Sequence, residues 1–350
     1  RLSGILLPWV GFPWLLLCLI RARQQPGWKW PARAALVIGT IGTVNATTLF
    51  FIILGLAIWL SADAMSGFTR WRDAAKTLLW LGIGSVSVSL WWLMSLVMQS
   101  SFGLPILRYS ETYETVAKAS LPQELLRGLG YWFFYGDEHA GRWIGPSAPY
   151  MYNRVVIIAG FVLVAIGLVS LAATRIPYRI HLSLLTLIGL GVAVGASPLT
   201  DSSPYGKIFD VVVNNESGFA LRSTPRAMPL ALLALALATA SGLHACMAFF
   251  RSTHNQPKRH WIGRAVIAVV LGSIIVNNFP WFTQRAMTEI ITRDENLPTY
   301  WTEAAAAIDT QRDEATGFGR TYEFPAANFA DYWWGGTVDP VLPGLIASEY

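Results

Sequence analysis

Long apolar runs, separated by polar segments, dominate the chain up to about residue 282. They span roughly 4–20, 34–60, 77–99, 155–173, 180–198, 228–250 and 265–282. Most of them are close to the roughly 20 residues that an α-helix needs to cross about 30 Å of hydrocarbon. The pattern therefore predicts an all-α polytopic membrane protein, built as a bundle of several membrane-crossing helices.

The run 34–60 is too long for one upright helix, and its centre at 42–48 has the polar sequence GTVNATT. Basic residues flank it on both sides: Arg21, Arg23, Lys29 and Arg33 before it, and Arg70, Arg72 and Lys76 after it. Because cytoplasmic loops carry an excess of Lys and Arg, both flanks are expected in the cytoplasm. This requires a re-entrant pair of half-length helices, with Val44–Thr48 inside the bundle near a cavity. One long tilted helix is the alternative.

With the re-entrant pair, the remaining segments alternate between the two sides of the membrane. The outer segments are 100–154, 199–227 and 283–350, and the cytoplasmic ones include 174–179 and 251–264. We expect 1–282 to form the membrane region and 283–350 to begin a water-facing domain. We also expect the chain, which starts at Arg1 without Met, to be an internal piece of a longer protein.

Composition supports the membrane class and excludes several others. Hydrophobic residues make up 53% of the 350 residues and charged residues 13%, about half the share of roughly 25% that soluble domains have. Such a chain is not an ordinary soluble enzyme, nor a disordered, collagen-like or coiled-coil protein. Its two cysteines, Cys18 and Cys246, lie inside apolar runs, which argues against a disulfide framework or a cysteine-ligated metal site.

Motifs for nucleotides, metals and nucleic acids are absent from the sequence. It has no GxxxxGK[ST] phosphate loop, no HExxH zinc helix and no GxGxxG turn, and its five histidines are scattered. No metal site is expected. The net charge of +5 does not come from a basic stripe, so no nucleic acid is expected as a partner. The cytoplasmic cations Arg175, Arg179, Lys258 and Arg259 are expected to attract anionic membrane lipids or an acidic cytosolic protein, for which an acyl carrier protein would fit by charge.

Acidic residues concentrate on the outer side. Of 21 Asp and Glu residues, only Asp63 and Asp73 lie in predicted cytoplasmic segments, so acid chemistry is expected on the outer face. Glu111 and Glu114 in the long outer loop would share one face of a helix. A carboxylate there can accept the proton of a sugar hydroxyl or hold the sugar in place. A solvated acidic loop is the alternative.

Two arginines precede the long apolar run 228–250, in the sequence LRSTPR at 221–226. The planar guanidinium suits phosphate because it forms bidentate hydrogen bonds, so Arg222 and Arg226 are candidates for binding a lipid phosphate. The alternative is contact with ordinary phospholipid headgroups at the membrane surface. In the tail, Tyr332, Trp333 and Trp334 are candidates for stacking on sugar faces or for docking on the membrane.

Five motifs, in a fixed order, carry a resemblance to a known family. They are LPWV at 7–10, GTVNA at 42–46, YSET at 109–112, LRSTPR at 221–226 and YWWGGTVDP at 332–340. Taken together, the chain resembles the alpha-(1→3)-arabinofuranosyltransferase family of actinobacterial cell-wall synthesis (arabinofuranosyltransferase D type). The resemblance extends through nearly the whole chain.

The resemblance implies a GT-C membrane fold and an inverting glycosyltransferase. Its donor would be decaprenyl-phosphate-arabinofuranose, and its acceptor the arabinan of arabinogalactan and lipoarabinomannan. The reaction would take place on the periplasmic side of the bacterial plasma membrane. No cofactor is required, because the donor already carries a phosphate as leaving group, and a divalent metal is optional.

The resemblance also implies roles for single residues. The family's acidic residue after its Tyr falls on Glu111, which favours Glu111 over Glu114 as the catalytic residue, and Tyr109 becomes a sugar contact. The family's Arg and Lys fall on Arg222 and Arg226, although the family's neighbouring His and Phe are replaced here by Thr-Pro and Ala. GT-C enzymes also carry an acidic residue, usually the base, in their first periplasmic loop, and we expect that loop to lie before the start of this chain.

Two other functions stay open at this point. One is a GT-C mannosyltransferase that uses polyprenyl-phosphate-mannose, because the residues do not identify the sugar. The other is a non-catalytic transporter of polyprenyl lipids or glycans. A transporter is expected to show inverted repeats and charges at the membrane midplane, and the sequence shows neither.

Overall fold

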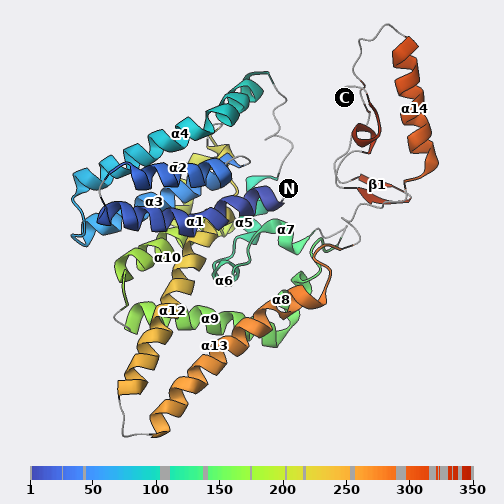
Figure 1. The fold of residues 1–350 in the computed structure, drawn as a ribbon. Helices are drawn as coiled ribbons and strands as arrows, with labels where there is room; N and C mark the ends of the chain where they lie inside the picture. The colour runs from blue at the N-terminus through green and yellow to red at the C-terminus, as the bar shows by residue number, and fades with distance from the viewer. Residues whose placement is uncertain are drawn as a thin grey trace. The chain divides into compact units, whose positions relative to one another are not determined.

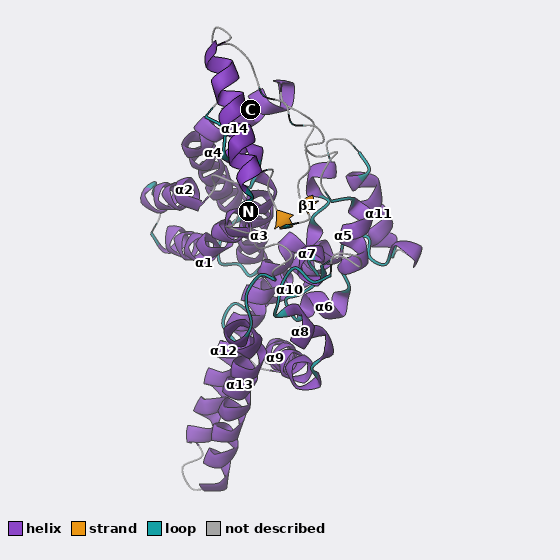
Figure 2. Ribbon diagram, turned by 90° about the vertical axis from the view of Figure 1, so that its right-hand side faces the viewer, coloured by secondary structure: helices purple, strands orange, loops and turns teal. Residues whose placement is uncertain are grey.

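The computed structural model describes residues 2–25, 27–41, 45–102, 111–136, 141–173, 176–201, 203–215, 218–252, 257–288, 297–314, 321, 323, 330–332, 334–337 and 341–347. Most of these residues are helical (Figure 2). The chain divides into two compact units, which are 1–132 with 158–277, and 133–157 with 278–350.

Four long helices open the first unit: α1 (Leu2–Gln24), α2 (Lys29–Ile41), α3 (Ala46–Met65) and α4 (Trp71–Phe102). They lie side by side, with α1 packed on α2 and α3, and α4 packed on the same two helices (Figure 1). Their shared core contains Phe12, Ile38 and Ile52, which are almost fully buried. The apolar sequences of these helices thus bury one face each and leave the other exposed.

Two helices of opposite direction, rather than one long tilted helix, occupy the run 34–60. The carboxamide oxygen of Asn45 caps α3 by accepting a hydrogen bond of 2.9 Å from the backbone N–H of Thr48. Arg23 near the end of α1 pairs with Asp63 near the end of α3, so the polar flanks of the run meet at one end of the bundle. The expectation of half-length helices is wrong for α3, whose 20 residues are enough to cross a membrane alone. Residues 42–44 lie outside the described part.

The rest of the first unit is arranged around α10 (Arg179–Val194). This helix packs on α3, on α6 (Pro122–Leu126), on the 3-10 turn η4 (Thr224–Ala227) and on α12 (Met228–Ser252). The short helices α5 (Tyr113–Ala119) and α11 (Pro204–Val213), with the turns η2 (Leu199–Asp201) and η3 (Phe219–Leu221), belong to the same unit.

Three helices contain residues of both units: α7 (Trp132–Tyr135), α9 (Arg154–Ala173) and α13 (Pro257–Thr283).

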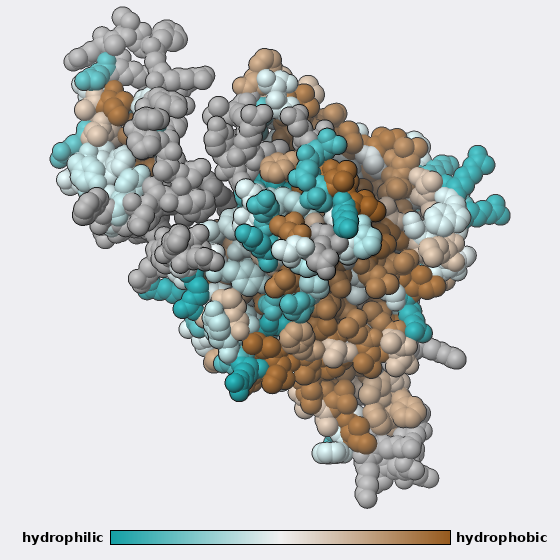
Figure 3. Space-filling model, turned by 180° about the vertical axis from the view of Figure 1, so that it is seen from behind, coloured by the Kyte–Doolittle hydropathy of each residue, from teal (hydrophilic) through white to brown (hydrophobic). Residues whose placement is uncertain are grey.

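Five helices of the described residues are long and apolar enough to cross a membrane: Ala46–Met65, Trp71–Phe102, Arg154–Ala173, Thr224–Phe250 and Trp261–Thr283. A shorter apolar helix is α10. Hydrophobic residues cover a large part of the molecular surface in Figure 3, and exposed apolar side chains such as Leu79 and Val86 lie on α4. The prediction of a helical, multi-pass membrane protein is therefore confirmed.

The second unit contains α8 (Ser147–Tyr152), α14 (Thr299–Glu314), the turn η6 (Leu342–Gly344) and a two-stranded antiparallel hairpin. The hairpin joins β1 (Ala330–Tyr332) to β2 (Gly335–Thr337), with Tyr332 opposite Gly335. Within this unit, Thr288 donates a backbone hydrogen bond of 2.9 Å to the carbonyl of Trp143. The division into a membrane region 1–282 and a water-facing domain from 283 stays a prediction.

Candidate active site

One carboxylate and two guanidinium groups meet at the end of the first unit where α3 begins. The carboxylate of Glu111 lies 3.7 Å from Nη2 of Arg222 and 3.6 Å from Nη2 of Arg226. Ser223 donates a much shorter hydrogen bond, 2.6 Å, to Oε1 of Glu111. Nε of Arg222 also donates to the backbone carbonyl of Glu111 at 2.7 Å. The structure thus brings together Glu111, Arg222 and Arg226, which the sequence singled out separately.

The helix α5 fixes the position of Glu111. Thr112 caps this helix, because its hydroxyl accepts a hydrogen bond of 3.3 Å from the backbone N–H of Thr115. Tyr113, the first residue of α5, is buried and its ring stacks on Phe209 of α11 with the ring centres 6.5 Å apart. Burial raises the pKa of Tyr113 to about 12, so its ring stays neutral and packed at physiological pH. The N-cap of α5 and the packing of Tyr113 therefore fix the backbone position of Glu111.

The arginines come from the turns η3 and η4, which precede α12. Nη1 of Arg222 donates to the carbonyl of Phe219 at 3.2 Å, and its guanidinium lies 4.5 Å from the centre of the Phe219 ring. The turn η4 packs tightly on α10, and Thr224 is almost fully buried there. Gly195 has φ +56°, and a Cβ at this position would lie 2.9 Å from the Thr224 hydroxyl, so the close approach requires glycine.

The electrostatics of the site leave the arginines able to bind an anion. Arg222 is only 5% exposed, and burial lowers its pKa, while the nearby Glu111 carboxylate acts in the opposite direction. An arginine nevertheless keeps its charge at any physiological pH. Arg226 donates through Nη2 to the hydroxyl of Tyr131 at 3.3 Å, whereas its buried Nε has no hydrogen-bond partner among the residues that the structure describes. One buried N–H of Arg226 is therefore available to a ligand.

The start of α3 borders the same region. Thr47 donates a hydrogen bond of 3.1 Å to the carbonyl of Ala220, which precedes Arg222 by two residues. Thr48 is fully buried. Of the stretch predicted to lie inside the bundle, Thr48 is buried and Asn45 and Thr47 are half-buried, whereas Ala46 is exposed and Val44 lies outside the described residues.

The other candidate residues are Glu114, Tyr109 and three aromatic residues of the tail. Glu114 is exposed in the first turn of α5. Tyr109 and Trp333 are not among the described residues. In the second unit, Tyr332 and Trp334 stack on each other, with ring centres 5.1 Å apart and planes 6° from parallel. Each of these two rings thus has one face already covered by the other.

Sequence reasoning missed two members of the site. Ser223 lies inside the arginine motif but was not assigned a role, although a hydroxyl beside two arginines is a signal for anion binding. Tyr131 is not part of the site expected from the sequence, and its hydroxyl contacts Arg226. Among the described residues, no group of three or more His, Cys, Asp or Glu side chains is placed to hold a metal ion.

These features define a class: a multi-pass helical membrane protein with a partly buried carboxylate–arginine site at one end of its bundle. The family model for the alpha-(1→3)-arabinofuranosyltransferase, N-terminal GT-C domain, matches residues 1–350, and the chain belongs to this family. It is 27% identical, over 364 residues, to an alpha-(1→3)-arabinofuranosyltransferase of Mycobacterium tuberculosis (strain ATCC 25618 / H37Rv). That match covers 98% of this chain but 24% of the relative. No solved structure matches.

The comparisons confirm the resemblance drawn from the five motifs, and with it the all-α GT-C membrane class. They do not bear on single site residues. Since the chain spans about a quarter of the length of its relative, the activity of the whole protein belongs to the proposal that follows.

Proposed function

We propose that the chain forms the membrane region of an inverting glycosyltransferase. It would transfer arabinofuranose from decaprenyl-phosphate-arabinofuranose to the arabinan of arabinogalactan or lipoarabinomannan. The observation that carries the proposal is the pairing of Glu111 with Arg222 and Arg226 in a chain of this family. The site would face the periplasm from the bacterial plasma membrane. Family membership favours arabinofuranose over mannose, and a transferase over a transporter.

In the proposed reaction, the acceptor hydroxyl oxygen forms a bond to the anomeric carbon of the donor. The bond from that carbon to the phosphate oxygen breaks, and the phosphate leaves with the electron pair. A single displacement of this kind inverts the configuration. The hydroxyl proton passes to a carboxylate, and the charge that develops on the leaving phosphate needs nearby cations. Glu111 is the candidate for the first role, and Arg222 and Arg226 are the candidates for the second.

The observed contacts suggest how donor binding and base activation are linked. The carboxylate of Glu111 lies between both arginines and accepts the Ser223 hydrogen bond, so its oxygens are occupied by these contacts. A phosphate offers more oxygen atoms to the same guanidiniums and would displace the carboxylate. Glu111 would then become free to accept the proton of the acceptor hydroxyl, or to position the acceptor for a base supplied by another part of the whole protein.

The partners that follow are the lipid-linked donor, the arabinan acceptor and the surrounding membrane lipids. No cofactor is required in this scheme. An acidic cytosolic partner such as an acyl carrier protein stays a prediction without support from the structure or from the comparisons.

The test is the transfer of labelled arabinofuranose from decaprenyl-phosphate to a synthetic arabinan acceptor by membranes that contain the full-length protein. Glu111→Gln keeps the size of the side chain and removes its charge. If Glu111 is the general base, kcat should fall about 100- to 10,000-fold. If Glu111 positions the acceptor, the variant should mostly raise the acceptor KM.

Glu114→Gln is the matched control, because Glu114 is exposed and lies one helical turn further along the chain. It should keep near-normal kcat and KM. Normal kinetics for Glu111→Gln, at normal protein levels, would show that the site has been wrongly assigned. Absence of any arabinofuranose transfer by the unmodified protein would contradict the proposed activity.

A further inference from the structure

One short hydrogen bond holds the side chain of Glu111. The backbone of this residue is already fixed, because its carbonyl accepts a hydrogen bond of 2.7 Å from Nε of Arg222 and α5 begins two residues later. A glutamate side chain turns about three bonds and has much rotamer freedom to lose. Ser223 donates to Oε1 of Glu111 at 2.6 Å, whereas both guanidinium groups lie at 3.6 Å or more. Ser223 is therefore the group that selects one conformation of the carboxylate.

The hydroxyl of Ser223 is presented by a rigid turn. Ser223 caps η4, and its carbonyl accepts a hydrogen bond of 3.2 Å from the backbone N–H of Arg226. Pro225, the second residue of η4, has its φ locked by the pyrrolidine ring. Ser223 itself is only 2% exposed. A serine hydroxyl has a single proton to donate, and here it is directed to Glu111.

The two oxygens of the Glu111 carboxylate have different surroundings. Oε1 accepts the hydrogen bond from Ser223 and lies 3.6 Å from Nη2 of Arg226. Within the part of the chain that the structure describes, no hydrogen bond reaches Oε2, and Arg222 approaches it only to 3.7 Å, which is beyond hydrogen-bond length. A general base needs an oxygen with a free lone pair within reach of the acceptor hydroxyl. Oε2 meets this requirement.

We propose that Ser223 is a positioning residue of the transfer reaction, which holds Oε1 of Glu111 so that Oε2 faces the acceptor hydroxyl. This inference rests on the proposed function, with Glu111 as the base. The hydroxyl proton moves to Oε2 while the acceptor oxygen bonds to the anomeric carbon and the phosphate leaves with the electron pair of the broken bond. A donor phosphate competes for the two arginines but need not displace the neutral Ser223. Glu111 thus keeps its place when the donor binds.

The experiment is steady-state transfer of labelled arabinofuranose by the full-length protein in membranes, with donor and acceptor varied separately. Ser223→Ala should lower kcat about 10- to 100-fold, the scale of one hydrogen bond to a charged group. Its acceptor KM, its donor KM and its affinity for decaprenyl phosphate should stay within about twofold of the parent values, which also shows that the site is folded. Ser223→Thr keeps the hydroxyl and should recover most of kcat. Equal kcat values for the two variants would overturn the proposal.

A double variant separates positioning from a direct role. Because Ser223 acts through Glu111, Ser223→Ala should cause no further loss of kcat in the Glu111→Gln background. Losses that multiply would overturn the proposal. Weaker binding of decaprenyl phosphate by Ser223→Ala would do the same, since it would make Ser223 a phosphate ligand, and so would a rise in acceptor KM with kcat unchanged. Normal kinetics of Glu111→Gln alone would instead contradict the proposed function.

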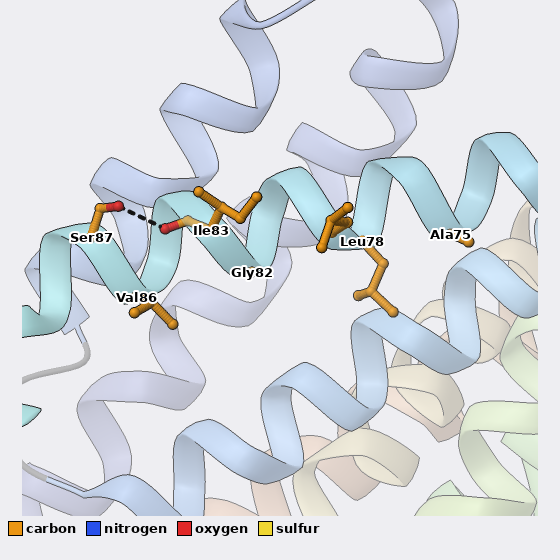
Figure 4. A pocket seen from close by; sticks show the side chains of 7 residues that line it. Ala75, Leu78, Gly82, Ile83, Val86 and Ser87 are labelled. Atoms are coloured by element: carbon orange, nitrogen blue, oxygen red, sulfur yellow. Dashed lines mark hydrogen bonds between the residues drawn. The ribbon is translucent and has the colours of Figure 1, made fainter.

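Two serines whose hydroxyls bond to their own helix serve as controls. Ser120 is fully buried and donates to the carbonyl of Val116 at 2.6 Å, the same length as the Ser223 bond. Ser87 is exposed on α4 and donates to the carbonyl of Ile83 at 2.9 Å (Figure 4). Ser120→Ala and Ser87→Ala should keep near-parent kcat. A loss in Ser120→Ala as large as that in Ser223→Ala would reduce the effect to that of any buried serine and overturn the proposal.

Discussion

Two guanidinium groups face one carboxylate in the candidate site, and neither is tightly bound to it. Their distances to Glu111, 3.7 Å and 3.6 Å, are longer than the roughly 2.7–2.9 Å of a charge-assisted hydrogen bond. The short contacts of Glu111 go instead to Ser223 and, through its backbone carbonyl, to Arg222. Such an arrangement holds the loop in place, and an incoming phosphate would exchange with the carboxylate only at these two longer contacts.

This exchange predicts opposite effects for two substitutions on donor binding. Arg222→Ala removes a cation and should weaken the binding of decaprenyl phosphate by roughly 1.5–3 kcal/mol. Glu111→Gln removes the competing anion and should tighten it, even though turnover falls. Binding of decaprenyl phosphate to the purified protein in detergent, measured by calorimetry, tests both. Unchanged affinity in Arg222→Ala would leave contact with ordinary headgroups as the explanation for this arginine.

The sequence was sufficient to single out Glu111, Arg222 and Arg226, but not to pair them. The charge of a side chain, its position in an outer segment and its place in a family motif can each be recognised from a short stretch of sequence. The contacts of Glu111 with Arg222 and Ser223 join residues that are more than a hundred positions apart in the sequence. They depend on how η3 packs on α11 and how η4 packs on α10. The preference for Glu111 over Glu114 rested on the resemblance, because spacing alone treats the two carboxylates alike. Their different burial appears only after folding.

At the scale of helices, the apolar pattern predicted most of the membrane-crossing elements, because burial in lipid requires long uninterrupted apolar stretches. It also located the break in the run 34–60. It failed on the length of α3, since a polar stretch at 42–48 marks a helix boundary without fixing how far the next helix extends. The N-cap at Asn45 and the apolar run behind it give α3 its full length.

A buried polar cluster joins three of these helices at the other end of the bundle. Oδ1 of Asp63 on α3 lies 2.6 Å from Nη1 of Arg23 on α1 and 2.9 Å from Nε2 of His181 on α10. Asp63 and His181 are each about 1% exposed, and Trp59 and Tyr178 pack around the imidazole. A carboxylate so deeply buried is tolerated because it has both partners.

Asp63→Asn should therefore destabilise the bundle. It leaves Arg23 without its counter-ion, and loss of one partner of a buried ion pair typically costs about 3–5 kcal/mol. The measurement is the apparent Tm of the purified protein in detergent. Asp73→Asn, which changes an exposed carboxylate, is the control and should stay within about 0.5 kcal/mol. Equal Tm values for the two variants would show that the cluster does not stabilise the helices.

At the scale of the membrane-spanning unit, the two polar clusters lie at opposite ends of the same helices. The helix α3 begins beside the arginine turn, through Thr47 and Ala220, and ends at Asp63. The helix α10 runs from His181 at the Asp63 cluster to Gly195 at Thr224. The distance from Asn45 to Asp63 along α3 is about 27 Å, close to the hydrocarbon thickness of a bilayer. We therefore expect the two clusters to lie at opposite membrane surfaces.

This separation makes the proposed orientation testable with one pair of positions. Ser66, the C-cap of α3, lies beside the Asp63 cluster, and Lys207 is exposed on α11 in the predicted outer segment 199–227. The basic flanks of α2 and α3 predict that Ser66 faces the cytoplasm.

In intact cells, a membrane-impermeant maleimide should label Lys207→Cys but not Ser66→Cys. The Ser66→Cys variant should react only after permeabilisation. The parent protein reports any background from Cys18 and Cys246. Labelling of Ser66→Cys in intact cells, with Lys207→Cys protected, would place the Glu111 site on the cytoplasmic side and contradict a periplasmic transferase.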